Sequence, residues 1–332
     1  MKLSHGKKIE ITLAVLALLL LTTGAARAAN ATAEGSFART LKVSGAVDLD
    51  VKTGSGNIVL RTGDAGIVQI NAKIKASESW RGGIGAEEKV RRLEAHPPIE
   101  QNGNTIVIGQ IEDRDLRDNI SISYELVVPA DTKLRSHTGS GNQTIDGVRG
   151  TLEAGTGSGD LKISNVGGEV RANTGSGNVE MNSVKGPVRA TTGSGDVRAR
   201  GMAGAFYGST GSGNIEVQQS AQGDVEVSTG SGDIEASGVR GGIRARTGSG
   251  GIRAEGEMKG DWRLHTSSGS VTVRLPQGAA FDLSARSSSG GIHTAHPITV
   301  QGTIGKRELI GKVRGGGPLL DVSTSSGSIH IE

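Results

Sequence analysis

The sequence predicts an all-β fold: a parallel β-solenoid with coils of about 18 residues, preceded by a less regular N-terminal β region containing one short helix. Three observations support this prediction. The 332 residues include 54 Gly but only seven Pro and no Cys. A Thr-Gly-Ser-Gly motif recurs at near-constant spacing, which is the signature of a repeat architecture. Apolar residues within each repeat alternate with a period of two, as they do in β-strands.

The composition excludes several other classes of protein. Gly does not recur at every third residue and Pro is scarce, so the chain is not collagen-like. Phe, Trp and Tyr make up only 2% of the residues, which argues against a core built on large rings. The balance of 34% hydrophobic and 21% charged residues argues against simple acidic or basic disorder. Without Cys there is no disulfide framework, thiolate metal site or Cys nucleophile.

Residues 1–28 have the pattern of a cleaved secretory signal peptide. The basic residues at the start are Lys2, Lys7 and Lys8. An apolar run from Ile11 to Leu21 follows, and Ala26-Arg27-Ala28 gives a small-residue cleavage pattern. The apolar run is about half the ~20 residues that a membrane span needs. We therefore expect cleavage after Ala28 rather than a membrane anchor.

Removing this segment also removes the apparent basic charge. The sequence has 37 basic and 34 acidic residues, and residues 1–28 hold four of the basic and one of the acidic ones, which leaves 33 of each. A neutral mature chain gives no support for nucleic-acid binding. No second apolar run is long enough to span a membrane. We expect an exported protein, periplasmic or at the cell surface, with no transmembrane segment in the mature chain.

Residues 29–135 are expected to form an irregular strand and capping region that is continuous with the solenoid, since an open coil would expose an edge. The expected strands lie within 37–75, 105–108 and 120–128, with Asn102-Gly103 as a hairpin-type turn. The segment Ala86–Ala95 is the one helix-capable stretch, because its acidic residues come early and its basic residues late. Pro97-Pro98 ends it.

Residues 136–332 carry the regular repeat. Thr-Gly-Ser-Gly begins at positions 53, 138, 156, 174, 192, 210, 229 and 247, and the steps from 138 onward are 18 or 19 residues. Degenerate copies begin at Thr266, Ser287 and Thr324. Each coil is expected to fold into two or three faces, and the length allows roughly ten coils stacked ~4.8 Å apart. The apolar positions lack a clean six-residue period, so we expect a right-handed solenoid rather than a left-handed hexapeptide helix.

The alternation within one copy extends into the motif itself. Val170, Ala172, Thr174 and Ser176 share one face of a continuous strand. We therefore expect the motif Thr and Ser to point inward or to line an inward corner. A buried hydroxyl without a partner is costly, so the stacked hydroxyls should bond to each other or to the backbone. The Gly after Ser is expected where the strand bends.

The residue after that Gly forms a predicted turn ladder, with Asn or Asp in six successive coils. Its members are Asn142, Asp160, Asn178, Asp196, Asn214 and Asp233. Asn and Asp stabilise turns by bonding to nearby backbone, which is the structural interpretation. The alternative is a calcium ladder. Half of the column is neutral Asn, however, and the spacing differs from that of calcium-binding nonapeptide repeats. We therefore assign the column a structural role and no metal.

A second column, two positions later, indicates parallel stacking. Its members are Lys162, Glu180, Arg198, Glu216, Glu235 and Arg253. Most neighbours along this column are opposite in charge, as an in-register stack favours. Each exposed pair contributes only ~0–1 kcal/mol, so the column would set register more than stability.

These features together resemble a known family. The segment 120–163, the repeated T-G-S-G-[DN]-[IVL] strands and the signal peptide look like those of the bacterial putative-adhesin β-solenoid proteins, a family of unknown function. They are also similar to the head domains of autotransporter-type adhesins. The resemblance covers nearly all of the mature chain and implies a solenoid fold. It carries over no catalytic residues.

The residues themselves indicate no catalytic or cofactor site. His293 and His296 are the closest pair among the mature histidines, but no acidic cluster accompanies them. Gly-Ser-Gly lacks the Lys and the following helix of a phosphate loop. Asp and Glu recur at turn and ladder positions, which a structural role predicts. A basic stripe could include Arg171, Arg189, Arg244 and Arg253, but acidic neighbours dilute it, and we interpret it as a solvated face.

We expect a non-enzymatic binding scaffold or adhesin of the cell envelope, with an envelope polymer, a glycan or a protein as partner and no cofactor. The alternatives are a polysaccharide-acting β-helix enzyme, which would need converging carboxylates in a cleft, and an envelope signalling or assembly component. The preference for a binding scaffold rests on analogy between folds.

Overall fold

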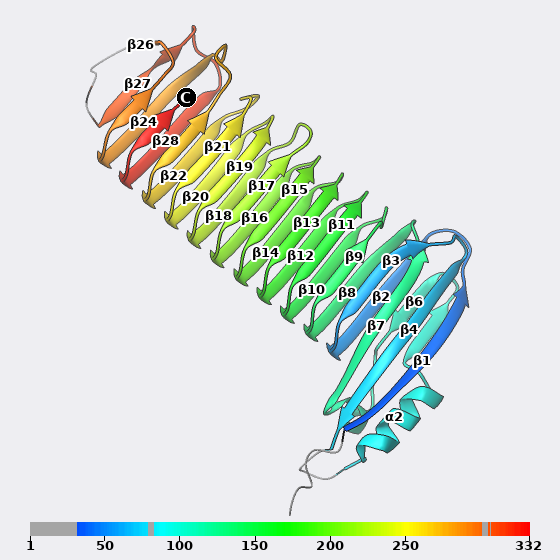
Figure 1. Ribbon diagram of the computed structural model, residues 1–332. Coiled ribbons are helices and arrows are strands. Elements are labelled where there is room, and N and C mark those ends of the chain that lie inside the picture. Colours follow the sequence, from blue (N-terminus) through cyan, green and yellow to red (C-terminus); the bar gives the residue numbers. More distant parts are fainter. Residues whose placement is uncertain (1–31, 79–82, 301–304, 306) are drawn as a thin grey trace, which may run out of the picture.

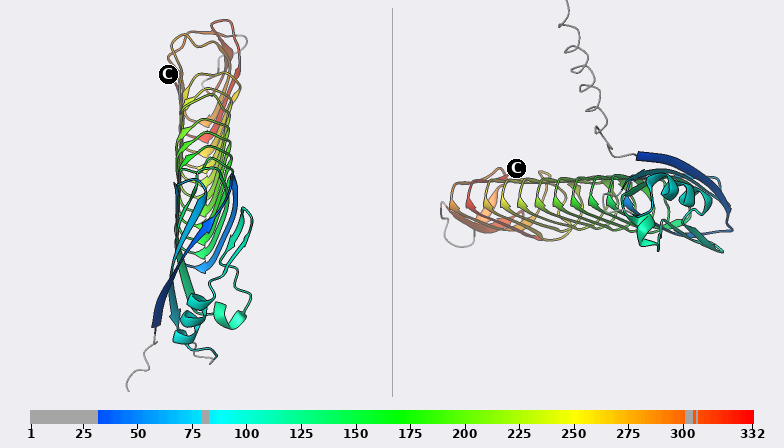
Figure 2. Two further views of the ribbon diagram at one scale, coloured as in Figure 1. Left: turned by 90° about the vertical axis from the view of Figure 1, so that its right-hand side faces the viewer. Right: turned by 90° about the horizontal axis from the view of Figure 1, so that it is seen from below.

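The computed structural model describes residues 32–78, 83–300, 305 and 307–332. The predicted signal peptide at residues 1–28 lies outside them. The chain forms an elongated rod made of two long sheets, with the N-terminal region and its helix at one end (Figures 1 and 2). One sheet has 15 strands and the other has 14. Within the described residues, no helix has the length and apolar character needed to cross a membrane.

The two sheets divide each coil into two strands. The 15-stranded sheet holds the Thr-Gly-Ser segments, and we name it the motif sheet. Its strands are β2 (Val47–Ser55), β5 (Ile99–Asn102), β6 (Thr105–Ile108), β8 (Thr132–Ser140), β10 (Leu152–Ser158), β12 (Val170–Ser176), β14 (Val188–Ser194), β16 (Phe206–Ser212), β18 (Val225–Ser231), β20 (Ile243–Ser249), β22 (Trp262–Ser268), β24 (Phe281–Ser289), β26 (Ile298–Val300), β27 (Glu308–Val313) and β28 (Leu319–Ser326).

We name the 14-stranded sheet the second sheet. Its strands are β1 (Thr32–Lys42), β3 (Ile58–Gly63), β4 (Ile67–Ser77), β7 (Ile120–Pro129), β9 (Gln143–Asp146), β11 (Leu161–Val166), β13 (Val179–Val184), β15 (Val197–Met202), β17 (Ile215–Gln219), β19 (Ile234–Val239), β21 (Ile252–Gly256), β23 (Val271–Arg274), β25 (Ile292–Thr294) and β29 (Ile329–Ile331). Neighbouring strands from β8 to β23 pair in parallel one coil apart, so that Thr174 lies between Thr156 and Thr192. The predicted parallel β-solenoid is confirmed, with two faces per coil.

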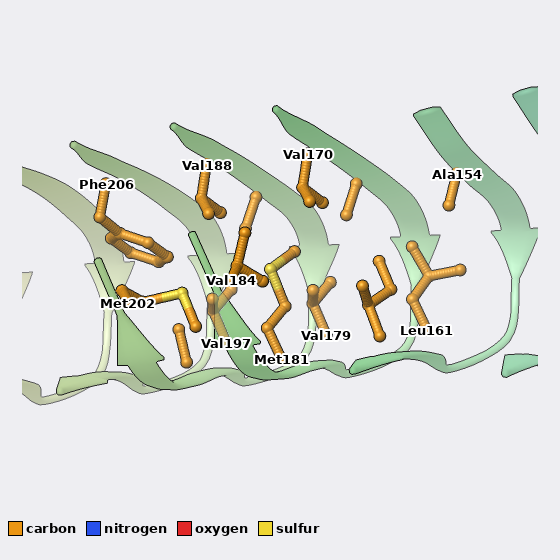
Figure 3. Close-up of a cluster of buried hydrophobic side chains, with 14 of the residues drawn as sticks. Ala154, Leu161, Val170, Val179, Met181, Val184, Val188, Val197, Met202 and Phe206 are labelled. Carbon is orange, nitrogen blue, oxygen red and sulfur yellow. The ribbon is translucent and has the colours of Figure 1, made fainter. Parts of the chain in front are cut away.

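The core is a thin layer of side chains between the two sheets. Residues alternate between buried and exposed along each strand, as in Val170–Ser176. Figure 3 shows small and medium aliphatic side chains from both sheets meeting in this layer, with Phe206 as the one labelled ring. The predicted absence of a core built on large rings is therefore confirmed for this part of the rod. The interior is narrow enough for Val, Ile, Leu, Met and Ala to fill it.

The prediction that the motif side chains point inward is confirmed for Thr and wrong for Ser. Thr174 is buried, and its hydroxyl donates to the carbonyl of Gly159 in the preceding coil at 3.0 Å. The same bond recurs in most coils, so the hydroxyls bond to backbone rather than to each other. Ser176 is exposed, although it lies two residues after Thr174. The chain bends at Gly177, the Gly after Ser, as predicted, but the alternation of faces already ends at Ser176, the last residue of the strand.

The last coil of the sequence does not lie at the end of the stack. In the motif sheet β28 lies between β22 and β24, and in the second sheet β29 lies between β23 and β25. Their partners confirm this order, because Ser326 pairs with both Ser268 and Ser289. The outermost coil is therefore β24–β25. The antiparallel strands β26 and β27 follow it in the motif sheet.

The N-terminal region has a similar order. The coil β2–β3 stacks in parallel on β8–β9, so that Thr53 pairs with Thr138, while β6 and β7 lie on its other side. Beyond β7 the second sheet continues with β4 and β1 as long antiparallel strands. The predicted Asn102-Gly103 turn joins the antiparallel pair β5 and β6.

The helix α2 spans Ala86–Ala95, as the sequence predicts. Its residues Ala86, Val90 and Leu93 are buried, and it packs against β1 and β4. Glu88 bonds to Arg92 one turn later at 2.7 Å, in the order that favours an exposed helix. A second, one-turn helix, α3 (Arg114–Arg117), is not predicted from the sequence; the side chain of Asp113 caps its start.

Candidate functional site

The outer face of the motif sheet carries one unusual side chain. Of the Phe, Trp and Tyr residues that the structure describes, all are buried except Tyr207, which is half-exposed on β16. It occupies the first outward position of its strand. The equivalent positions of the neighbouring coils hold charged residues. These are Arg171, Arg189, Glu226, Arg244 and Arg263.

Tyr207 contacts an arginine and also lines a groove. The guanidinium of Arg189, one coil earlier, lies 3.9 Å from the ring centroid, which is a cation–π contact and covers one face of the ring. The groove has a volume of about 560 Å³, and Tyr207, Glu226 and Arg244 are among the residues that line it, whereas Arg189 is not. We name this hollow the Tyr207 groove.

The residue just before each strand shapes the wall of this groove. These positions hold Ala205, Asp224, Gly242 and Asp261 in four successive coils, and all four line the groove. Carboxylates therefore alternate with residues that have little or no side chain. Gly242 lies between two carboxylates that are two coils apart, or ~10 Å, and the Asp224 carboxylate lies directly against it.

Hydrogen bonds hold the two carboxylates of the wall in place. Asp224 accepts the backbone N–H of Gly242 at 2.8 Å. Asp261 accepts the N–H of Leu319 at 3.0 Å and pairs with Arg263 at 2.9 Å. Glu226 and Arg244 are 4.0 Å apart and about half-exposed, so both keep free hydrogen-bonding capacity. The groove is thus lined by an aromatic ring, by carboxylates held in place as hydrogen-bond acceptors and by two guanidinium groups. Such a combination is typical of a ligand-binding surface.

All six residues of the predicted turn ladder occupy one stacked turn. The side-chain oxygen of each accepts the backbone N–H of the next member, at 2.8–2.9 Å. The ladder extends at both ends: Asn57 accepts the N–H of Asn142, and Asp233 accepts that of Gly251. Among the described residues, no three His, Cys, Asp or Glu side chains group as metal ligands would.

The charged column on the second sheet is in the predicted register but forms few of the expected ion pairs. Lys162 and Glu180 lie 4.0 Å apart. Arg198 instead pairs at 2.6 Å with Asp196 of its own coil. Glu216 pairs with Arg200 at 2.9 Å. Adjacent acidic or basic residues on the same surface therefore compete for each partner.

The other candidate residues do not form a shared site. Arg171, Arg189 and Arg244 lie on the motif sheet, whereas Arg253 lies on the second sheet, so the structure does not bring the basic residues together as one stripe. His293 stacks on His330 with ring centroids 5.1 Å apart. His296 is buried against Phe281.

Sequence reasoning missed the Tyr207 groove, although one signal for it was present. Tyr207 is the one aromatic residue at a position that is charged in the adjoining coils. The carboxylates of Asp224 and Asp261 were harder to single out, because Asp is common at turns throughout the repeat.

Comparisons with known proteins add a family and two solved structures. The family model described as Toastrack DUF4097 matches residues 167–332. The chain is similar to a putative cell adhesion protein from Clostridium sporogenes ATCC 15579 and to a putative adhesin from Bacteroides fragilis NCTC 9343. Each is 12% identical with a TM-score of 0.29, and the alignments cover 90% of this chain and 99% and 97% of those chains. No curated protein matches the sequence.

Proposed function

Because the chain belongs to the Toastrack DUF4097 family, a family defined by its fold, we propose a function from the surface of the rod: non-enzymatic binding of a partner in the cell envelope. The partner is an envelope polymer, a glycan or a protein. The single observation that carries the proposal is the Tyr207 groove, where the exposed aromatic ring adjoins fixed hydrogen-bonding groups.

The state of the carboxylates supports binding rather than hydrolysis. A glycoside hydrolase needs one carboxyl group as acid and a second as base or nucleophile. Asp224 and Asp261 are instead bonded to backbone N–H groups, and Asp261 is also paired with Arg263. These contacts hold both carboxylates as hydrogen-bond acceptors in fixed positions. Such groups orient a ligand.

We assign the parts of the chain as follows. Residues 1–28 direct export to the periplasm or the cell surface and are removed. Residues 29–135 cap the solenoid, and residues 136–332 carry the binding face. The turn ladder from Asn142 to Asp233 holds the coils in register and needs no metal.

The test is binding of the full mature chain to isolated envelope fractions. We expect saturable binding of the fluorescently labelled chain, displaced by unlabelled chain. In parallel, the chain is incubated with envelope polysaccharide and new reducing ends are measured; we expect none above the rate of a buffer control. Absence of saturable binding would overturn the binding function, and sustained release of reducing ends would show an enzyme instead.

A further inference from the structure

We infer that the Tyr207 groove binds an uncharged oligosaccharide that lies along the axis of the rod. This inference rests on the proposed binding function and names the class of ligand. It depends on three features of the groove: one open aromatic face, a near balance of charge, and a lining that continues over successive coils.

The aromatic face supplies the apolar part of the site. The C–H face of a pyranose ring packs against an aromatic ring, and such a contact requires one accessible ring face. Arg189 covers one face of Tyr207 at 3.9 Å, and Tyr207 lines the groove, so the uncovered face is the contact surface we assign to the sugar. Arg189 also holds the ring in place, so less conformational freedom is lost when a ligand binds.

The charges in the groove favour a neutral ligand. Three carboxylates, on Asp224, Glu226 and Asp261, line it together with the guanidinium groups of Arg244 and Arg263. A polyanion placed in the groove would lie close to all three carboxylates and would be repelled. Sugar hydroxyls both donate and accept hydrogen bonds. They can therefore accept from the two arginines and donate to the carboxylates without leaving a buried charge unpaired.

The arrangement of the coils favours a chain of sugars over a single one. The groove is lined from β14, β16, β18 and β20 through to β22, which are consecutive strands of the motif sheet. Strands in a sheet lie ~4.8 Å apart, so the lining extends for roughly 20 Å along the axis. A linear ligand could place one ring on Tyr207 and another farther along the groove, beside Arg244 and Arg263.

The experiment is calorimetric titration of the full mature chain with defined hexasaccharides. The neutral probes are cellohexaose, maltohexaose and chitohexaose, and the anionic probe is hexagalacturonate. We expect at least one neutral probe to bind, with an affinity that changes less than twofold between 50 and 500 mM salt. Binding of hexagalacturonate alone, weakening with salt, would overturn the neutral ligand.

Variants connect the binding to the groove. Tyr207→Ala should weaken binding at least tenfold, whereas Tyr207→Phe should stay within threefold, because the ring face is kept. Arg253→Ala is the matched control, since Arg253 is an exposed charge on the opposite sheet. Circular dichroism and thermal melting of each variant verify folding, and Glu226→Gln provides a second groove variant that keeps the shape of the side chain.

The outcomes separate this inference from the proposed function. If no neutral hexasaccharide binds at millimolar concentration, or if Tyr207→Ala binds as well as wild type, the saccharide site is refuted. If envelope binding nevertheless persists and is unchanged in Tyr207→Ala, the general binding function stands and uses another surface. If wild type binds neither envelope fractions nor saccharides, both fail.

Discussion

The threonine of each Thr-Gly-Ser-Gly motif from Thr138 to Thr247 is buried, and its hydroxyl donates to a glycine carbonyl of the neighbouring coil. For Thr192 the acceptor is the carbonyl of Gly177, at 2.9 Å. The serine two positions later is exposed, at the end of the strand. One hydroxyl thus satisfies a backbone group at the corner, while the other is available to solvent. This division of roles explains why Thr, which also suits a β-strand, occupies the inward position.

Thr192→Val should therefore lower the free energy of unfolding by roughly 1–3 kcal/mol, because the shape is kept while a buried carbonyl loses its partner. Thr191 is the matched control, since it is the adjacent residue and points outward from the same strand. Thr191→Val should change stability by less than about 0.5 kcal/mol. Urea unfolding followed by circular dichroism measures both, and equal effects would contradict the assigned role of the Thr192 hydroxyl.

The first glycine of the motif is required by the close approach of the preceding coil. A Cβ at Gly193 would lie 2.5 Å from the carbonyl oxygen of Gly175, which is closer than real Cβ contacts. The same motif position in the first copy is Gly54, where a Cβ would meet nothing within 4 Å. Gly54 lies on β2, and the neighbour of β2 on the side away from β8 is β6. Strand β6 pairs with β2 only up to Val51, so it does not cover Gly54.

These two glycines give a matched pair of substitutions. Gly193→Ala should destabilise the protein by roughly 1–3 kcal/mol, because the coils on either side must separate or shift. Gly54→Ala should be neutral or stabilise by up to about 1 kcal/mol, through a lower entropy of the unfolded chain. Thermal melting of the two variants distinguishes the outcomes. If both variants melt alike, close stacking is not the reason for the glycine.

Among the secondary-structure elements, those with local signals were predictable. The bounds of α2 follow from its charge pattern and from Pro97-Pro98, and those of β6 from its flanking turn. The position of β28 and β29 inside the stack was not predictable. The copies at Thr266, Ser287 and Thr324 carry the same inward hydroxyl and the same corner, so each fits beside either of the others. Because each of these copies can stack on any of the others, the repeat sequence does not determine the order in which the coils stack.

Engineered disulfides test this order directly, because the chain has no Cys of its own. Ser268 and Ser326 are exposed register partners on adjacent strands, so Ser268→Cys/Ser326→Cys should oxidise to an intramolecular bond. Ser268 and Ser289 are separated by β28 and lie two strand spacings apart, about 10 Å, which is beyond the reach of a disulfide.

Thiol titration after mild oxidation reports the result. We expect loss of free thiols without dimer formation in the first double variant, and retention of free thiols in Ser268→Cys/Ser289→Cys. Efficient intramolecular bonding of the second pair would mean that the coils stack in sequence order.

For the whole molecule, sequence analysis gave the architecture more completely than the surface. Parallel coils and a thin aliphatic interior follow from periodicity, since each coil interacts mainly with its neighbours, whereas the choice of two faces over three does not. The Tyr207 groove depends on a combination of positions in successive coils: an aromatic residue, two spaced carboxylates and a glycine between them. No single repeat contains that combination, so it becomes visible only when the coils are stacked in register.

The position of the last coil, β28–β29, inside the stack also determines which strand forms the edge of the second sheet at that end of the rod. Both sides of β29 are covered, because it pairs with β23 and with β25. β25 is the edge strand of the second sheet, with β29 on one side only. In a parallel ladder the N–H groups of a strand alternate between its two neighbours, so part of the β25 donors has no strand to bond to.

The rates of amide hydrogen exchange in β25 and β29 should therefore be in the opposite order to the one that their positions in the sequence suggest. We expect the amides of Ile329–Ile331 to exchange more slowly than those of Ile292–Thr294, although β29 ends one residue before the last residue of the sequence. Exchange is slowest where opening must disrupt hydrogen bonds and packing on both sides. Mass spectrometry of peptides covering 281–294 and 319–332 makes the comparison, with residues 188–202 of the central coils as the internal reference. Faster exchange in β29 than in β25 would place the last coil at the end of the rod.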